Sequence, residues 1–168
     1  MGKVDIKIIL VAVIPFILLS CTKKEQYPII PHIEFDSFTK IENNLGHDDK
    51  GILAISFTDG DGNIGLDQND TQPPFDTTSI YYYNFFITYY EKQNGKFVEV
   101  ELPFTNNSRI PVLNQSGKDT PLKGVIQIEL FINNYFSTYD TIRFRASIVD
   151  RDLNQSNTIT TPDIIINK

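Results

Sequence analysis

Alternation of apolar and polar residues is the strongest constraint that this sequence places on its fold. From Ile52 to Thr58 the side chains of Leu53, Ile55 and Phe57 share one face of an extended chain. The same period of two recurs in segments 32–38, 97–102, 125–132 and 141–149. No segment after the first twenty residues keeps the 3.6-residue period of a helix. The pattern therefore predicts an all-β protein, a β-sandwich of seven to eight strands.

The longest predicted strand runs from Ile80 to Lys92 and is rich in tyrosine and phenylalanine. Asn94-Gly95 follows it, and this pair is a strong signal for a tight hairpin turn. We expect Phe85, Ile87 and Tyr89 to share the core-facing side, together with Tyr81 and Tyr83.

Prolines mark the weaker strands. Segment 109–113 is predicted as a short edge strand because Pro111 has no N–H to donate to a ladder. Pro162 is expected to disturb the middle of the last strand, 158–166. The polar stretch 64–79 has no apolar period, and a connection of this length is either functional or disordered.

Size and charge limit the function classes. A chain of 168 residues suits a single domain, and its 12 Phe and 8 Tyr supply apolar area for one core. The net charge of −6 and the lack of clustered Lys and Arg argue against a nucleic-acid partner.

The N-terminus reads as a targeting segment. Lys3 and Lys7 precede an apolar run of 12 residues, Ile8–Leu19, which is too short for a membrane-spanning helix. Leu18-Leu-Ser-Cys21 then resembles the lipobox of bacterial lipoproteins, in which the cysteine is acylated and becomes the first residue. Cys21 is also the only cysteine, so the chain forms no internal disulfide.

This resemblance implies three parts: a signal peptide over 1–20, a lipidated cysteine with a tether over 21–31, and a β-sandwich over 32–168. The acyl chains on Cys21 would supply the membrane attachment, at the outer membrane, because Thr22 carries no retention charge. The segment after Cys21 only partly resembles a surface-export signal, so the periplasmic and cell-surface faces both stay open.

An acidic loop follows the strand 52–58. Asp59, Asp61 and Asn63 alternate with glycines, which is a spacing that can aim oxygen ligands at a hard cation. The loop is not an EF-hand, because that motif needs glycine where Ile64 stands and glutamate where Asp70 stands.

A second acidic loop, with Asp150 and Asp152, follows the strand 141–149. If these two strands are B and F of an immunoglobulin-like fold, they run parallel and their loops meet at one pole. Close carboxylates repel unless a cation or a proton relieves them. This repulsion motivates the hypothesis that Asp59, Asp61, Asn63, Asp150 and Asp152 form a Ca²⁺ site. The alternative is two solvated turns, since Asp, Asn and Gly tolerate turn geometry.

Two other interpretations were weighed. Tyr82, Phe86 and Tyr90 are expected on the outer face of the long strand, as a stacking platform for sugars or as ordinary cross-strand pairs. The two histidines, His32 and His47, have no metal-type spacing and indicate no catalytic triad. We therefore expect no enzyme and no catalytic residues.

Several motifs together support a family resemblance. The lipobox, Phe57-Thr-Asp-Gly-Asp-Gly-Asn-Ile-Gly65, segment 109–113, Gly124-Val-Ile and segment 150–157 occur in one order along nearly the whole chain. In this they resemble a family of small Bacteroidetes lipoproteins with immunoglobulin-like sandwiches, mostly of unknown function. The resemblance implies a lipid-anchored envelope protein that acts as a non-enzymatic binding or structural module, with a protein or glycan partner. The alternative is a glycan-binding accessory lipoprotein of a polysaccharide-uptake system.

Overall fold

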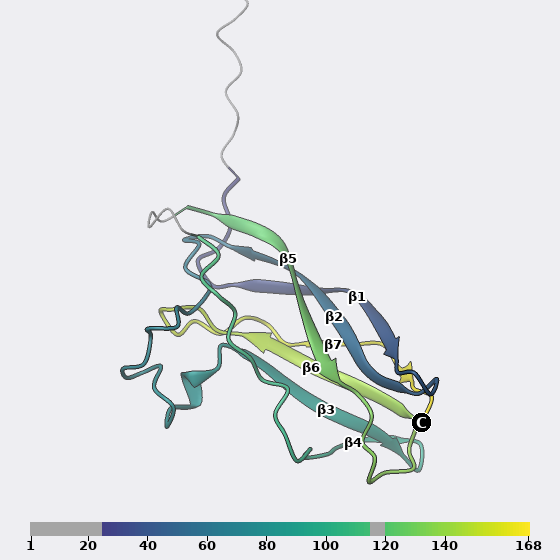
Figure 1. The fold of residues 1–168 in the computed structure, drawn as a ribbon. Helices are drawn as coiled ribbons and strands as arrows, with labels where there is room; N and C mark the ends of the chain where they lie inside the picture. The colour runs from purple at the N-terminus through teal and green to yellow at the C-terminus, as the bar shows by residue number, and fades with distance from the viewer. Residues whose placement is uncertain (1–24, 115–119) are drawn as a thin grey trace, which may run out of the picture.

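The described part of the chain forms eight antiparallel strands in two sheets (Figure 1). The computed structural model describes residues 25–114 and 120–168. Its strands are β1 (His32–Glu42), β2 (Asp48–Asp59), β3 (Phe85–Gln93), β4 (Lys96–Glu99), β5 (Leu122–Phe131), β6 (Thr141–Ile148), β7 (Ile159–Thr160) and β8 (Ile164–Ile165). A 3₁₀ helix, Ile80–Tyr82, precedes β3.

The order of the strands confirms the predicted sandwich. One sheet has the order β1-β2-β5, and the other has the order β4-β3-β6-β7, with β8 also pairing with β6. This is the immunoglobulin-like arrangement in which strands A, B and E face strands C, F and G, with the fourth strand, β4, beside strand C. In this arrangement β2 is strand B and β6 is strand F.

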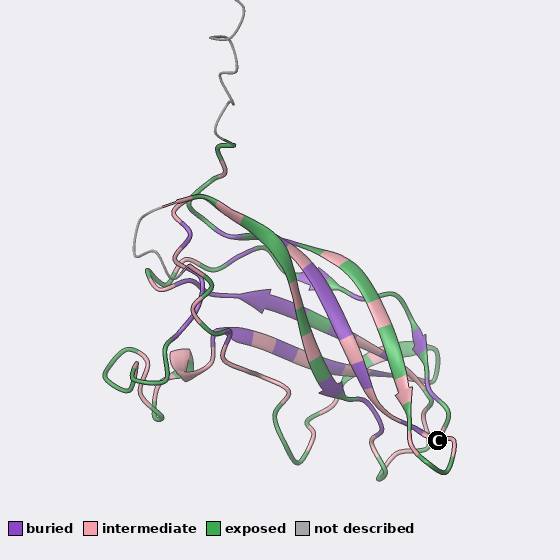
Figure 2. Ribbon diagram, turned by 45° about the horizontal axis from the view of Figure 1, so that its top comes forward, coloured by how far each residue is buried: buried purple, intermediate pink, exposed green. Residues whose placement is uncertain are grey.

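The core lies between the two sheets. Buried residues alternate with partly buried ones along β3 and along parts of β2 and β6, as Figure 2 shows by colour. The ring of Phe144 lies at the centre and packs against the rings of Phe38 and Tyr89, with centroids 5.9 and 5.6 Å apart. The core residues include Ile33, Leu53, Ile55, Phe57, Phe85, Ile87, Leu130, Ile142 and Ile148. All eight described strands and this core lie between residues 32 and 166, so a chain that starts at residue 22 contains all of them.

One predicted strand starts five residues too early, and another is wrong. Residues 80–84 do not extend β3, because the Ser79 side chain accepts the Tyr81 N–H and starts the 3₁₀ helix instead. Segment 109–113 forms no strand either. The carbonyl of Ile110 accepts the Leu66 N–H, so this segment pairs with the loop after β2 rather than with a sheet edge. As predicted, Pro162 interrupts the last strand, which is divided into β7 and β8.

The long connection between β2 and β3 is held in place by two arginines. The Arg109 guanidinium donates to the carbonyls of four residues of this connection, namely Asp67, Asp70, Phe75 and Tyr82. Arg151 donates to both carboxylate oxygens of Asp70, at 2.6 and 2.9 Å. Charge-assisted bonds to carbonyls and carboxylates order a segment that has no apolar period of its own.

One pole of the sandwich gathers the loops and the entering chain. β2 and β6 both end at the pole where β1 begins (Figure 1). Segment 25–31 lies against this pole, since a Cβ atom on Gly60 would be only 2.3 Å from the carbonyl oxygen of Tyr27. Glu25 pairs there with Lys123 at 2.7 Å. Cys21 and the rest of the predicted signal segment lie outside the described residues. Within residues 25–114 and 120–168, no helix has the length and apolar character needed to cross a membrane.

Candidate metal centre

The loop after β2 begins with a buried carboxylate. Asp59 is the last residue of β2 and is completely buried. Alternation along the strand turns its side chain to the same side as Phe57 and Ile55, which face the core. The chain then turns sharply at Gly62, which has a φ of +70°. A Cβ at this position would lie 2.0 Å from a backbone oxygen of Thr120, so only glycine fits here.

The loop after β6 supplies a second buried carboxylate. Asp150 follows β6 and is 1% exposed. Its Oδ1 accepts the backbone N–H of Asn154 at 2.8 Å, and its Oδ2 accepts the side-chain amide of the same residue at 2.9 Å. Two bonds from one residue fix the orientation of the Asp150 carboxylate, as outer-shell partners do around metal ligands.

The predicted meeting of the two loops is confirmed. Asp59, Asp61 and Asp150 each contribute one carboxylate oxygen, and these three oxygens lie within 4.8 Å of one another. They meet because β2 and β6 belong to facing sheets and end at the same pole (Figure 1). Residues 59 and 150 are 91 positions apart in the sequence, and the sandwich topology brings them together.

Asn63 and Asp152 complete the cluster from outside the three carboxylates. The side-chain amide of Asn63 donates to Asp61 at 3.1 Å and to Asp152 at 3.0 Å. Because both amide hydrogens are directed at carboxylates, the Oδ1 atom of Asn63 is left as a free acceptor. Asp152 is exposed and is joined to the cluster through Asn63.

The cluster contains more acceptors than donors. Both carboxylate oxygens of Asp59, Oδ1 of Asp61 and Oδ1 of Asn63 are buried and have no hydrogen-bond partner of normal geometry. An unpaired buried polar atom costs about 1–3 kcal/mol, and more if it is charged. Two like charges about 5 Å apart add roughly 3 kcal/mol at an effective dielectric constant near 20. The fold therefore concentrates negative charge here without supplying donors for it.

The proton affinities reflect this environment. Burial raises the pKa of Asp59 to about 7, and the charge of Asp61 adds to the rise, while the nearby Ile64 backbone N–H opposes it. Burial also raises the pKa of Asp150, although the two donors from Asn154 act in the opposite direction. These carboxylates thus favour a proton or a cation as a partner.

This arrangement can hold a metal ion. All the free ligand atoms are carboxylate or amide oxygens, which suit hard cations rather than zinc or copper. A cation among them would compensate the buried charge and use the unpaired oxygens of Asp59, Asp61 and Asn63. Asp150 would supply a third carboxylate, held in position by Asn154.

The other residues singled out in the sequence lie elsewhere. His32 begins β1 and His47 lies just before β2, so the length of the β1–β2 hairpin separates them. Phe86 and Tyr90 do lie on the outer face of β3, half-buried, but Tyr82 belongs to the 3₁₀ helix, where its ring contacts that of Tyr83.

Sequence reasoning missed the contacts that support the cluster. Asn154 holds Asp150, and Arg151 links the same loop to Asp70 in the β2–β3 connection. A signal for Asn154 was present, because its spacing of four from Asp150 suits a side chain that bonds back across a turn.

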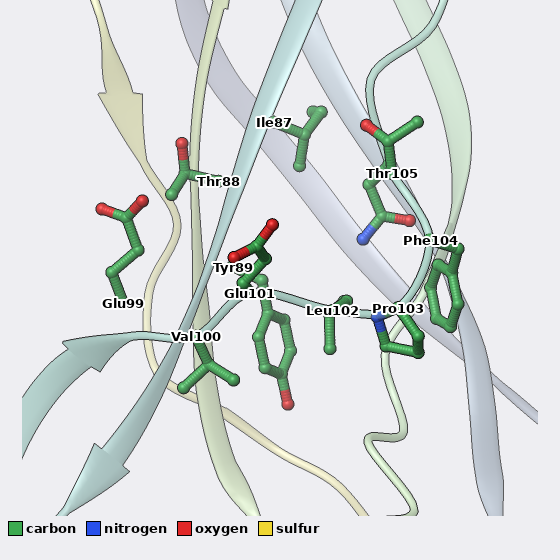
Figure 3. Close-up of a pocket in the computed structure, with 11 residues that line it drawn as sticks. Ile87, Thr88, Tyr89, Glu99, Val100, Glu101, Leu102, Pro103, Phe104 and Thr105 are labelled. Atoms are coloured by element: carbon green, nitrogen blue, oxygen red, sulfur yellow. The ribbon is translucent and has the colours of Figure 1, made fainter.

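A separate hollow lies beside β3. Segment 99–106 and β3 enclose about 490 Å³. Figure 3 shows Leu102, Pro103 and Phe104 following one another along this segment. None of the carboxylates of the metal cluster lines this hollow, which therefore forms no part of the candidate site.

No family model, no curated protein and no solved structure matches this chain. The fold and the site thus define the class by themselves. The protein is a two-sheet β-sandwich with an immunoglobulin-like strand order. At one pole it carries a buried cluster of three carboxylates that can hold a metal ion.

Proposed function

We propose that this protein is a lipid-anchored, non-enzymatic binding or structural module whose loop-bearing pole is organised by Ca²⁺. The observation that carries the proposal is the cluster of Asp59, Asp61 and Asp150 with its unpaired buried oxygens. A cation there would join the loops after β2 and β6, and through Arg151 also the long β2–β3 connection.

Calcium fits this cluster better than magnesium does. Ca²⁺ accepts six to eight oxygen ligands in flexible geometry, whereas Mg²⁺ keeps several waters and demands a near-ideal octahedron. The cluster offers several protein oxygens at once, from three carboxylates and one amide, and most of them are buried. A site of this kind favours the cation that gives up its waters more readily.

Isothermal titration calorimetry of the chain from residue 22 onward tests the calcium site. At pH 8, above the pKa of Asp59, we expect one Ca²⁺ to bind per chain and Mg²⁺ to bind more weakly. Asp59→Asn should abolish binding. The matched control is Asp36→Asn, which changes an exposed aspartate on β1 and should bind as the wild type does. Equal Ca²⁺ binding by the wild type and Asp59→Asn, or none by the wild type, would overturn the calcium assignment.

The proposal of a lipid anchor is based on the lipobox at Cys21. It is also based on the small number of residues between Cys21 and the domain. Three residues separate Cys21 from Glu25, which pairs with Lys123 at the pole where β1 begins. An extended chain spans at most about 3.6 Å per residue, so this pole would lie close to the membrane. We place the protein at the outer membrane, on its periplasmic or its surface face.

A binding or structural role agrees with the remaining chemistry. The two histidines are far apart, and the clustered carboxylates lie within 4.8 Å of one another rather than on the walls of the hollow beside β3. The β2–β3 connection and the loop after β6 occupy positions at which immunoglobulin-like domains commonly carry their binding loops. We therefore propose that the protein contacts its partner through loops or strand edges.

A glycan is the second candidate partner, favoured by the outer face of the second sheet. Phe86 and Tyr90 are partly exposed there, and the exposed Arg145 lies on the neighbouring strand, opposite Thr88. Aromatic faces stack on sugars, and an arginine binds their hydroxyl or carboxyl groups. A glycan array with the chain from residue 22 onward should show binding that Tyr90→Ala weakens. Binding unchanged in Tyr90→Ala, or an array without signal, would contradict this candidate.

A further inference from the structure

β5 leaves one edge of the first sheet open. It lies at the end of the β1-β2-β5 order, so among the described strands only β2 pairs with it. The pairing runs from Leu122 to Phe131 without a shift of register, and the strand therefore has no bulge. A long regular edge of this kind is a template for another strand.

The outward-facing backbone groups of β5 can be identified from its last residue. The side chain of Asn106 donates to the carbonyl of Phe131 and accepts its N–H, both at 3.2 Å, so this residue faces away from β2. In an antiparallel ladder, alternate residues face the same side. The outward residues are therefore Lys123, Val125, Gln127 and Glu129. Among the described residues, no backbone or side-chain group bonds to their main-chain atoms on this side.

The other edges of the two sheets are protected. β1 carries register shifts near Phe35 and Ile41, and charged side chains along its length. β4 has four residues, and β7 and β8 have two each, on either side of Pro162. Short, bulged and proline-broken edges resist pairing, so β5 stands out among the described strands.

We propose that β5 pairs with β5 of a second copy of this chain, antiparallel and with Ile126 at the two-fold axis. Val125 then faces Gln127 of the second copy, and Lys123 faces Glu129. Because these residues all direct their N–H and C=O groups outward, each facing pair exchanges two hydrogen bonds. The two three-stranded sheets become one continuous six-stranded sheet.

The side chains of β5 are self-complementary in this register. On the solvent face, the ammonium of Lys123 meets the carboxylate of Glu129, twice by symmetry. On the core face, Ile128 lies opposite Gly124, which has no side chain and lies over the ring of Phe57. Ile126 and Ile128 are only partly covered in the single chain and would bury more apolar area in the pair.

The charges select the register more than they supply affinity. Lys123 and Glu129 are exposed and already pair with Glu25 and Lys50, so each new ion pair adds at most about 1 kcal/mol. Affinity comes from the backbone ladder and from Ile126 and Ile128. The antiparallel arrangement directs the two N-terminal segments to opposite ends, so an anchored pair would lie with its strands along the membrane.

Analytical ultracentrifugation of the chain from residue 22 onward tests the proposal. We expect a monomer–dimer equilibrium that Gln127→Pro shifts to monomer. Proline removes only an outward N–H at this position, so the ladder with β2 and the melting curve should be preserved. Gln127→Thr, which keeps the N–H, is the matched control and should dimerise. A wild type that stays monomeric up to roughly 0.1 mM, where a dimer held by about 5.5 kcal/mol is populated, would overturn the proposal. A dimer that persists in Gln127→Pro would overturn it equally.

A charge swap tests the register. Lys123→Glu and Glu129→Lys should each weaken dimerisation about tenfold, because each change creates two like-charge contacts across the axis. The double variant should restore it, since opposite charges face each other again. Single variants that dimerise like the wild type, or a double variant that stays monomeric, would contradict the register centred on Ile126.

Discussion

Both carboxylate oxygens of Asp59 are buried and accept no hydrogen bond of normal geometry, while Asp61 and Asp150 lie within 4.8 Å. In the absence of a cation, removing one of these charges should relieve repulsion. We therefore expect Asp59→Asn to melt at a temperature equal to or higher than the wild type at pH 8 in EDTA. In millimolar Ca²⁺ the order should reverse, because only the wild type gains from the ion.

This reversal separates a metal ligand from an ordinary buried residue. If Asp59 were a purely structural residue, its replacement would destabilise the protein by the same amount in both buffers. Melting temperatures of Asp59→Asn that lie equally below the wild type, with and without Ca²⁺, would contradict the ligand role.

The raised pKa of Asp59 predicts a pH dependence of stability. In the folded chain the pKa is about 7, and its ordinary value is 3.8, so between these values the folded state binds more protons than the unfolded state. The free energy of unfolding therefore falls as pH rises from about 4 to 7, and this contribution is constant above pH 7. Denaturant unfolding in EDTA at a series of pH values measures this slope. The free energy of unfolding of Asp59→Asn should depend less on pH over the same range. An equal slope in both proteins would contradict the assignment of this pH dependence to Asp59.

Carboxylates with lowered pKa values affect the stability of the fold in a different pH range. Arg151 lowers the pKa of Asp70, and Arg143 lowers that of Asp163. These groups stabilise the fold above their ordinary pKa, and that stabilisation is lost as pH falls through their folded pKa values. They therefore do not mask the trend assigned to Asp59 between pH 4 and 7.

At the scale of the elements, the conformation of the β2–β3 connection depends on the contacts of single side chains. Arg151 binds both oxygens of Asp70 and the carbonyl of Gly65, and thereby ties this connection to the loop after β6. We expect Arg151→Ala to make segment 66–79 much more sensitive to limited proteolysis, because the bidentate contact is lost. The melting temperature should fall by only a few degrees, since the core is untouched.

Arg145→Ala is the matched control for this prediction. Arg145 is an exposed arginine on β6 for which the described structure shows no ion pair. Its replacement should leave the protease pattern unchanged. Cleavage within 66–79 that is the same in Arg151→Ala and the wild type would contradict the role of Arg151.

The strands could be predicted from the sequence wherever packing alone selects the structure. The two-residue period of β2, β3 and β6 marks core positions such as Leu53, Ile87 and Phe144, and all three are buried. The two-residue period predicted the wrong structure at Tyr81–Tyr83. There the side chain of Ser79 caps a 3₁₀ helix despite the high β-propensity of the tyrosines. The period also predicted the wrong structure at segment 109–113, whose backbone partner, Leu66, lies in a loop with no periodic signal.

The site could be predicted in part for a similar reason. Spacing placed Asp59 and Asp61 in one loop, and the assignment of β2 and β6 as strands B and F brought Asp150 to them. Side-chain directions were beyond reach, because they depend on individual hydrogen bonds. Asn63 turns its amide toward Asp152 in the other loop, and this contact does not follow from residue order.

At the scale of the whole molecule, the segment that follows the proposed anchor lies at the same pole as the carboxylate cluster. Segment 25–31 lies against Gly60 of the acidic loop, so the membrane attachment would enter beside the proposed calcium site. We expect Cys21→Ser to abolish incorporation of a labelled fatty acid and to move the protein out of the membrane fraction. Thr22→Ser, at the adjacent residue, should retain both. Label or membrane association that persists in Cys21→Ser would contradict the anchor.

The most direct test of the metal centre is the thermal unfolding of the wild-type chain from residue 22 onward in EDTA and in excess Ca²⁺. A ligand at about a hundred times its dissociation constant adds about 2.7 kcal/mol to the stability of the folded state. For a domain of this size, that corresponds to a rise of roughly 5–10 °C in melting temperature. We predict a rise of this order with Ca²⁺ that Asp59→Asn does not show. Identical wild-type melting curves in EDTA and in millimolar Ca²⁺ would contradict the account.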